Sequence, residues 1–136
     1  DLIETHDAFT ISDLQTYGDV GLTLYGEEQE YVRSGECYHI NPHTGKPGKC
    51  PSNTSGGLLG TMHAVGATGI FQCNEVLWQL QGKYDKFHGD PKLWQRYGKT
   101  KPDDWKSLQV KNPRRGVAIS HAGVGSHVTC AVLENV

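Results

Sequence analysis

The chain opens with short apolar runs separated by polar ones. Residues 2–5 are typical of a short strand end, and a loop is expected over residues 6–9. Thr10 is a suitable N-cap with Asp13 three residues later, and Gly18 can end the helix that follows. The helical spacing predicts an apolar face made of Phe9, Ile11, Leu14 and Tyr17.

This periodicity is lost over residues 26–57. Prolines and glycines lie close together there, at Pro42, Gly45, Pro47 and Gly48. They predict a long loop excursion rather than an element of the core. Loops of this length in a compact domain are either functional or disordered.

A second periodic stretch runs from Gly66 to Gln81, and Gly82 follows it. It predicts the longest helix of the chain, with small residues in its first turn. Free backbone amides in such a turn can attract an anion or a developing oxyanion, and close packing of another segment is the alternative. The apolar residues at helical spacing are Ile70, Cys73, Leu77 and Leu80.

Residues 83–115, which we call the aromatic insertion, are polar but rich in aromatic side chains. Asp90 and Pro91 predict an N-cap with proline in the first helical position, and the short helix should reach Tyr97. Trp94 and Tyr97 at helical spacing are typical of a local core. Alternatively, these aromatic side chains wall a pocket for a bulky acyl group. The aromatic residues are Tyr84, Phe87, Trp94, Tyr97 and Trp105.

Two β-rich runs close the chain, at residues 116–120 and 127–133, with a glycine-containing segment at 121–126 between them. Strand, turn and strand is the natural interpretation. Because strands and helices alternate, the fold class is α/β, and the length suits one domain over residues 1–136. The pattern does not give the strand order.

Composition narrows the classes of function. The net charge is -2, and no basic cluster is denser than residues 111–115, so we expect no nucleic-acid partner. Because no apolar run approaches a membrane span and the first residues do not resemble a secretion signal, we expect no membrane partner. Four unevenly spaced cysteines favour reduced thiols and a cytoplasmic location. The only methionine is Met62, which leads us to expect a longer polypeptide.

Three histidines stand at boundaries between predicted elements. His6 follows the first strand, His63 precedes the longest helix, and His121 follows the penultimate strand. Each alone is commonly an exposed or hydrogen-bonded side chain. Together they favour a site, because loop ends at one edge of an α/β sheet are where sites are built. Imidazole suits acid–base work, since it exchanges a proton near neutral pH.

Four segments resemble thiolase motifs. Residues 53–60 and 62–69 are similar to the thiolase run in which Asn-x-x-Gly-Gly leads into Gly-His-Pro-x-Gly-Ala-x-Gly. His-Asp-Ala-Phe at 6–9 resembles the His-Asp-Cys-Phe loop of the sterol-carrier-protein type. His-Ala-Gly-Val-Gly-Ser at 121–126 resembles the His-Asn-x-Gly-Gly segment of the sterol-carrier and archaeal members. The resemblance implies the C-terminal half of a thiolase fold, a mixed β-sheet layered with helices.

The resemblance also implies roles for individual residues. His63 matches the histidine that activates the nucleophilic cysteine, and His6 matches the loop residue that lines an oxyanion hole, where asparagine is usual. The nucleophilic cysteine itself belongs to the other, N-terminal half of the fold. The substrate-binding residues that the resemblance implies are Asn53, Gly56, Gly57, Gly66 and Gly123.

Substrates and partners follow from the same resemblance. Coenzyme A thioesters are expected as substrates, with no tightly bound cofactor and no metal. A homodimer is expected. Members of the sterol-carrier and archaeal branch often associate with a small zinc-ribbon and OB-fold subunit, so such an accessory partner is a further expectation.

The chain departs from the thiolase pattern at several positions. Thiolases need a second acid–base group at the substrate α-carbon, usually a cysteine, and this chain has Ala8 and His121 at the two positions that supply it. His121 is therefore the candidate for this proton transfer. Met62 and Ala64 replace the glycine and proline around the activating histidine, and Ala122 replaces asparagine.

These departures leave two other functions open. A thiolase-like aldolase would cleave a carbon–carbon bond without an acyl-cysteine; the missing cysteines favour it, whereas His63 opposes it. A non-catalytic metal-binding or interaction domain is the other alternative, because two thiols and two imidazoles within one loop form a possible tetrahedral set. These four are Cys37, His39, His43 and Cys50. For Cys73 and Cys130 we expect small buried thiols.

Overall fold

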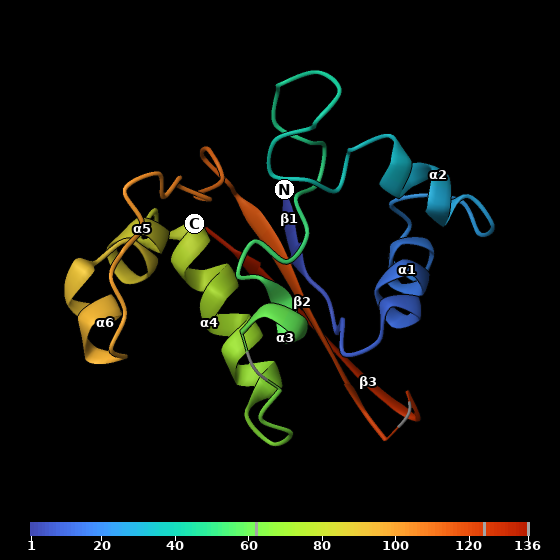
Figure 1. Ribbon diagram of the computed structural model, residues 1–136. Helices are drawn as coiled ribbons and strands as arrows, with labels where there is room; N and C mark the ends of the chain where they lie inside the picture. Colours follow the sequence, from blue (N-terminus) through green and yellow to red (C-terminus); the bar gives the residue numbers. More distant parts are fainter. Residues whose placement is uncertain (62, 124, 136) are drawn as a thin grey trace.

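The computed structural model describes residues 1–61, 63–123 and 125–135. A three-stranded mixed sheet of order β1-β2-β3 lies at its centre (Figure 1). β1 runs parallel to β2, and β3 runs antiparallel to β2. The strands are β1 (Leu2–Glu4), β2 (Arg115–Ala122) and β3 (His127–Glu134).

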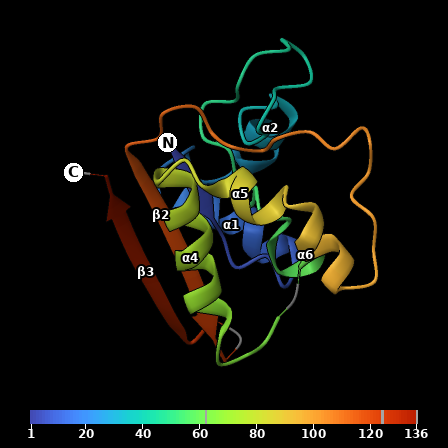
Figure 2. The same cartoon turned by 90° about the vertical axis from the view of Figure 1, so that its left-hand side faces the viewer.

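Helices lie on both sides of this sheet, with α4 on one side and α1 and α2 on the other, as the two views in Figures 1 and 2 show. The fold is therefore α/β, as the sequence predicts. Of the helices in the described residues, none is both long and apolar enough to cross a lipid bilayer. The helices are α1 (Thr10–Asp19), α2 (Glu28–Arg33), α3 (Gly57–Gly60), α4 (Thr68–Leu80), α5 (Tyr84–His88) and α6 (Pro91–Arg96).

Each face of the sheet has its own small core. Leu2 and Ala118 pack against Val76 and Leu80 of α4 on one face. On the other face, Ile3 and Ile119 pack against Cys50. Because side chains alternate between the faces of a strand, neighbouring residues of β1 and β2 serve different cores.

The terminal elements confirm the predicted strand, helix and hairpin, but not every detail. β2 and β3 form an antiparallel hairpin. The predicted N-cap Thr10 is wrong, because Thr10 is the first residue of α1 and the N-cap residue is Phe9, which makes no side-chain capping bond. The predicted apolar face of α1 is wrong, because Phe9 is 66% exposed and Ile11 is also exposed. Tyr17 is buried and packs with Tyr31 of α2, so only the end of the helix faces a core.

The longest helix turns only part of its predicted apolar face inward: Cys73 and Leu80 pack in the core, whereas Leu77 is exposed. The helix starts at Thr68, so Gly66 precedes it, and Ile70 is 68% exposed. The prediction fails because polar side chains of α4 find hydrogen-bond partners on neighbouring segments, which removes most of the penalty for burying them. The buried residues of α4 are Thr68, Gln72, Glu75, Val76, Gln79 and Leu80.

Residues 26–57 are not only a loop excursion. They contain α2, and Tyr31, Cys37 and Cys50 are buried. The prediction of a segment outside the core is therefore wrong, because Cys50 packs on the sheet next to Ile3 and Ile119.

The aromatic insertion contains the predicted helix and one that was missed. Asp90 caps α6 by accepting a hydrogen bond from the Lys92 backbone N–H at 2.9 Å, as predicted. α5 precedes it without a predicted counterpart. Tyr97 is 77% exposed, so its assignment to a local core is wrong. Cys130 is also exposed rather than buried, because its side of the edge strand β3 carries no covering layer in the described residues.

Candidate active site

The three predicted histidines come together at one edge of the sheet. The ring centroid of His6 lies 5.0 Å from that of His63, with the two rings nearly perpendicular. It lies 5.1 Å from the ring centroid of His121, and these two rings are stacked with an interplanar angle of 17°. His6 is therefore the central ring of a cluster, which we call the histidine site.

Sheet topology explains this convergence. β1 and β2 are parallel, and their register ends with Glu4 opposite Ala118. Because parallel strands end at the same edge of a sheet, the residues just beyond these two positions emerge side by side. His6 lies just beyond the end of β1, and the segment before α4 brings His63 to the same edge. His121 lies past the end of the β1–β2 register but still inside β2, where it pairs with Val128 of β3. The prediction that His121 follows the strand is therefore wrong, because the hairpin extends the strand pairing to Ala122.

Burial and neighbouring imidazoles together keep His6 neutral. His6 is 6% exposed, and burial is the largest cause of its lowered pKa. Positive charge on His121 or His63 lowers the pKa of His6 further. The Nδ1 atom of His6 is buried without a hydrogen-bond partner among the described residues. A neutral imidazole with an unused nitrogen suits a hydrogen-bonding role better than that of a fixed cation.

His63 is held by the first residue of α4. Its Nδ1 atom lies 2.9 Å from the Thr68 hydroxyl oxygen, and Thr68 is buried. This contact orients an otherwise exposed imidazole. Sequence reasoning missed Thr68, although a threonine near a helix start is a common hydrogen-bonding residue.

Asn53 supports the end of β1 rather than pointing an unused amide into the site. Its Oδ1 atom accepts a hydrogen bond from the Thr5 backbone N–H, and its Nδ2 atom donates one to the Thr5 hydroxyl, both at 2.7 Å. Since Thr5 immediately precedes His6, these bonds fix the backbone from which that ring projects.

Gly57 is needed for close approach of Asp7. A Cβ atom at Gly57 would lie 2.0 Å from the Asp7 Oδ2 atom, and the backbone φ of Gly57 is +64°. The Leu58 backbone N–H donates to Asp7 Oδ1 at 2.6 Å. Gly56, with φ of +95°, precedes α3. In this structure both glycines shape the turn that anchors the segment following β1.

Glu4 is a buried carboxyl group that sequence reasoning missed. Its oxygens accept hydrogen bonds from the Ser55 hydroxyl at 2.6 Å and the Ser55 backbone N–H at 3.2 Å. Burial is the largest influence on this group and raises its pKa to about 7, although the Ser55 bonds oppose the rise. An acidic residue at a strand end gives no sequence signal of such burial.

A cavity of about 420 Å³ adjoins the histidine site between α4 and the β2–β3 hairpin. Gly66 and His121 line it, together with Gln72 and Cys73. Gly69 allows α4 to approach β2 closely, because a Cβ there would lie 3.2 Å from the Cβ of Ser120. This favours close packing as the reason for a small residue at position 69. Gly123 lies in the turn of the hairpin with φ of +51°.

The aromatic insertion does not wall this cavity in the described residues. Phe87 stacks on Trp78 with ring centroids 4.3 Å apart, and Tyr84 stacks on His88 at 4.2 Å. Trp94 donates from its indole nitrogen to the His88 carbonyl oxygen at 2.9 Å. The insertion therefore packs on itself and on α4, so the acyl-wall hypothesis is not supported.

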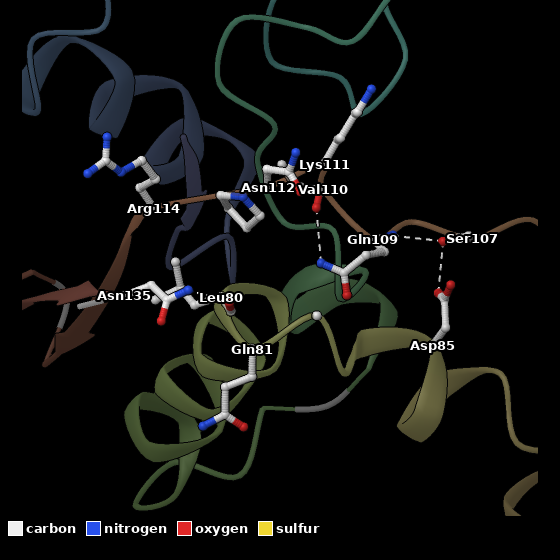
Figure 3. A pocket seen from close by; sticks show the side chains of 12 residues that line it. Leu80, Gln81, Asp85, Ser107, Gln109, Val110, Lys111, Asn112, Arg114 and Asn135 are labelled. Carbon is white, nitrogen blue, oxygen red and sulfur yellow. Dashed lines mark hydrogen bonds between the residues drawn. The ribbon is translucent and has the colours of Figure 1, made fainter.

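A larger cavity, of about 670 Å³, lies at the opposite edge of the sheet (Figure 3). Residues at the end of α4 line it together with the segment between Ser107 and Arg114. Figure 3 shows the charged ends of Lys111 and Arg114 directed away from the centre of the group. No histidine or cysteine is found among the described residues that line it.

The four possible metal ligands do not assemble. Across residues 1–61, 63–123 and 125–135, no group of three or more His, Cys, Asp or Glu side chains has an arrangement that could hold a metal ion. Cys37 packs with Tyr17, whereas Cys50 packs with Ile3. His43 instead makes a 2.8 Å contact from Nε2 to the Arg33 carbonyl oxygen.

Two residues of the motifs, Met62 and Val124, lie outside the described residues.

Comparison with known proteins covers the first two thirds of the chain. Residues 1–90, which include His6 and His63, match the model of a family described as "Thiolase C-terminal domain-like". Human sterol carrier protein 2 (Homo sapiens) is 40% identical over 86 residues, which are 63% of this chain and 14% of that protein.

Two microbial relatives extend the comparison. Acetyl-CoA acetyltransferase of Methanothermobacter thermautotrophicus is 40% identical over 86 residues, covering 63% of this chain and 21% of that protein. Benzoylsuccinyl-CoA thiolase subunit BbsB of Thauera aromatica is 32% identical over 90 residues, which are 66% of this chain and 22% of that protein. The matches thus span between 14% and 22% of the length of these three relatives.

Proposed function

Because the chain belongs to the thiolase C-terminal domain-like family, we propose that it is the C-terminal part of a thiolase-like acyltransferase. The proposed reaction cleaves or forms a carbon–carbon bond in a 3-oxoacyl-CoA thioester, with the nucleophilic cysteine supplied by the N-terminal half of the fold. The observation that carries this proposal is the cluster of three imidazoles with centroid separations of 5.0 and 5.1 Å.

His63 is the proposed base for the cysteine. A neutral imidazole can take the thiol proton, and the resulting thiolate attacks the substrate carbonyl. The contact between Nδ1 and the Thr68 hydroxyl orients the ring, which leaves Nε2 for the thiol. This assignment gives the exposed imidazole a reason to be held in one orientation.

His6 is the proposed donor to the substrate oxygen. The oxygen of a thioester or ketone gains negative charge as the tetrahedral intermediate or enolate forms. A preorganised donor aimed at such an oxygen is commonly worth about 3 kcal/mol. His6 suits this role because its lowered pKa keeps it neutral near pH 7 and burial limits its movement.

His121 is the proposed acid–base group at the α-carbon. When the carbon–carbon bond breaks, the α-carbon takes up a proton, and in the reverse direction it loses one. His121 replaces the cysteine that is usual at this position. Its place in the lining of the 420 Å³ cavity supports a role next to the substrate.

Coenzyme A thioesters are proposed as substrates, without a tightly bound cofactor. Gly66 adjoins the same cavity as His121 and is retained as a substrate contact, together with Gly123 in the hairpin turn. For Asn53, Gly56 and Gly57 a direct contact remains part of the proposal. Their hydrogen bonds and backbone conformations support a second role in holding the segment that carries His6.

Assembly and location are part of the proposal. We propose a homodimer, an optional zinc-ribbon and OB-fold accessory subunit, and a cytoplasmic location. Sedimentation of the purified protein would show the mass of the assembly, and a mass equal to one chain would contradict the dimer.

Mass spectrometry tests the central proposal. The protein, as its full-length gene encodes it, is incubated with acetyl-CoA or acetoacetyl-CoA, quenched in acid and digested. We expect an acyl adduct on one cysteine, reduced in the His63→Ala variant. Turnover of the thioester without any cysteine adduct would favour the aldolase alternative, which the absence of cysteine at positions 8 and 121 supports.

A further inference from the structure

Gln72 joins the two strand ends that carry His6 and His121. It lies on the buried side of α4 and is 1% exposed. Its Nε2 atom donates hydrogen bonds to the carbonyl oxygens of Thr5 and Ile119, each at 2.8 Å. A primary amide has two N–H hydrogens, so these two bonds use its full donor capacity.

The two hydrogen bonds of Gln72 lie where the pairing of β1 with β2 ends. The parallel register of β1 and β2 ends at Glu4 and Ala118, one residue before Thr5 and Ile119. Gln72 therefore continues the connection between the two segments where the strand ladder stops. Thr5 is the residue before His6, and Ile119 is two residues before His121, so the amide bonds the backbone within two residues of each stacked ring.

We propose that Gln72 is a positioning residue of the histidine site, which sets the separation of the His6 and His121 rings by holding the Thr5 and Ile119 carbonyl groups together. The role of Gln72 in catalysis rests on the proposed function, whereas its effect on the separation of the two rings does not. A side chain that lost the two donors would leave two carbonyl groups without partners and would let the strand ends move apart.

Gln79 offers a matched control on the same helix. It lies seven residues further along the same face of α4 and is as deeply buried as Gln72. Its Nε2 atom donates to the Thr54 hydroxyl at 3.0 Å and the Leu108 carbonyl oxygen at 2.9 Å. Because its partners lie outside the histidine site, its replacement should lower stability without moving the rings.

The pKa of His6 reports the separation of the rings. The pKa of His6 is lowered first by burial and then by His121 of β2 and His63 ahead of α4. The acidic groups on its own segment are Glu4 and Asp7. Charge on His121 contributes to the lowered pKa of His6. If the two rings move apart, this contribution falls, and the pKa of His6 should rise toward its ordinary value of 6.5.

The experiment compares Gln72→Met with Gln79→Met in the protein as its full-length gene encodes it. Histidines labelled with ¹³C at Cε1 are titrated by NMR, and His6→Asn identifies the His6 signal. Thiolysis of acetoacetyl-CoA is measured on the same samples. For Gln72→Met we expect an upward shift of the His6 pKa and a fall in kcat of about tenfold, with KM changed by less than about twofold. For Gln79→Met we expect a wild-type titration and kcat.

Other outcomes overturn the proposal. If both variants lose similar stability while the His6 titration is unchanged in both, or shifts equally in both, Gln72 has no special link to the rings. Should Gln72→Met fail to fold, Gln72→Asn keeps the amide but is too short to reach both carbonyl groups, and the same shift is expected. Wild-type protein without thiolysis activity would contradict the proposed function, while the NMR titration would still decide the role of Gln72.

Discussion

The two ends of α4 present two cavities of different character. The end near Thr68 adjoins the smaller cavity, of about 420 Å³, and of the three clustered imidazoles His121 lines it. The end near Leu80 adjoins the larger cavity, of about 670 Å³, where the charged ends of Lys111 and Arg114 point away. Three converging imidazoles, one of them with a lowered pKa, therefore identify a candidate site better than cavity volume does.

Buried amides on one helix serve both ends. Gln72 binds carbonyl groups at the histidine site, and Gln79 binds Thr54 and the segment near Leu108. Buried amides thus bond α4 to its surroundings at both ends, whereas the histidine site lies at the end near Thr68. Variants at the two ends should separate effects on catalysis from effects on stability.

The largest expected effect is on activity, from His63→Ala. Removing a general base costs about 10³ in kcat/KM, within the range typical for such groups. Lys111→Ala, at the larger cavity, is the matched control and should leave kcat/KM unchanged. Steady-state thiolysis of acetoacetyl-CoA measures both, and equal losses would show that the distinction between the two cavities is wrong.

Glu4→Gln should change how stability depends on pH. Burial raises the native pKa of Glu4 from 4.5 to about 7, so between these values native Glu4 is protonated while the unfolded chain is ionised. The unfolded state then binds fewer protons, and the contribution of Glu4 to stability is lost as pH rises through this window. In the wild type, the free energy of unfolding should fall by up to about 3 kcal/mol across this pH window. Glutamine does not titrate, so the variant should lack this fall.

Denaturant unfolding at a series of pH values from 4.5 to 8 measures this difference. The lowered pKa of His6 acts in the opposite direction, because native His6 loses its proton before the unfolded chain does. Subtracting the variant's profile from that of the wild type cancels the His6 contribution. Two profiles with the same slope would contradict the protonated state of buried Glu4.

Gly57→Ala should cost about 2 kcal/mol more stability than Gly82→Ala. Both glycines have φ of +64°, so the backbone strain of an alanine is the same at both positions. A Cβ at Gly57 would lie 2.0 Å from Asp7 Oδ2, whereas one at Gly82 would meet no heavy atom of the described residues within 4 Å. Thermal unfolding of the two variants measures the difference. Equal melting temperatures would show that the close approach of Asp7 to Gly57 does not affect stability.

The smallest effect is expected from Trp94→Ala in the aromatic insertion. The indole hydrogen bond to the His88 carbonyl would be lost, which is worth about 1 kcal/mol. The preference among acyl chain lengths should stay unchanged, because Trp94 is not among the described residues that line the 420 Å³ cavity. Tyr97→Ala is the exposed control. A changed chain-length preference with an unchanged melting temperature would restore the acyl-wall hypothesis.

Local chemistry made some elements predictable. Asp90 and Pro91 set the start of α6, and the glycine-containing segment predicted to separate two β-rich runs does join a hairpin, although its first two residues belong to β2. These features depend on neighbours in the chain, so sequence reasoning found them. The positions of His6 and His63 at element boundaries were predictable for the same reason.

Burial was less predictable. On α4 the polar Gln72 is buried while the apolar Ile70 is exposed. Gln72 can be buried because its amide donates hydrogen bonds to carbonyl oxygens of segments distant in the sequence. On α1 the apolar Phe9 is exposed for lack of a surface to cover it in the described residues. Hydrophobic periodicity identifies a helix, but it cannot show where hydrogen-bond partners from other segments will lie.

The amino-acid sequence by itself determined the α/β class, the Asp90 cap of α6, the hairpin, and the imidazoles of His6 and His63 at the boundaries of ordered elements. Only the tertiary structure decided that the ring of His6 lies next to both other rings and that its pKa is lowered. It also decided that Gln72 joins β2 to the segment after β1. The physical reason is distance. Capping and turn formation act over a few residues, whereas desolvation, charge repulsion and ring stacking depend on segments that folding alone brings together.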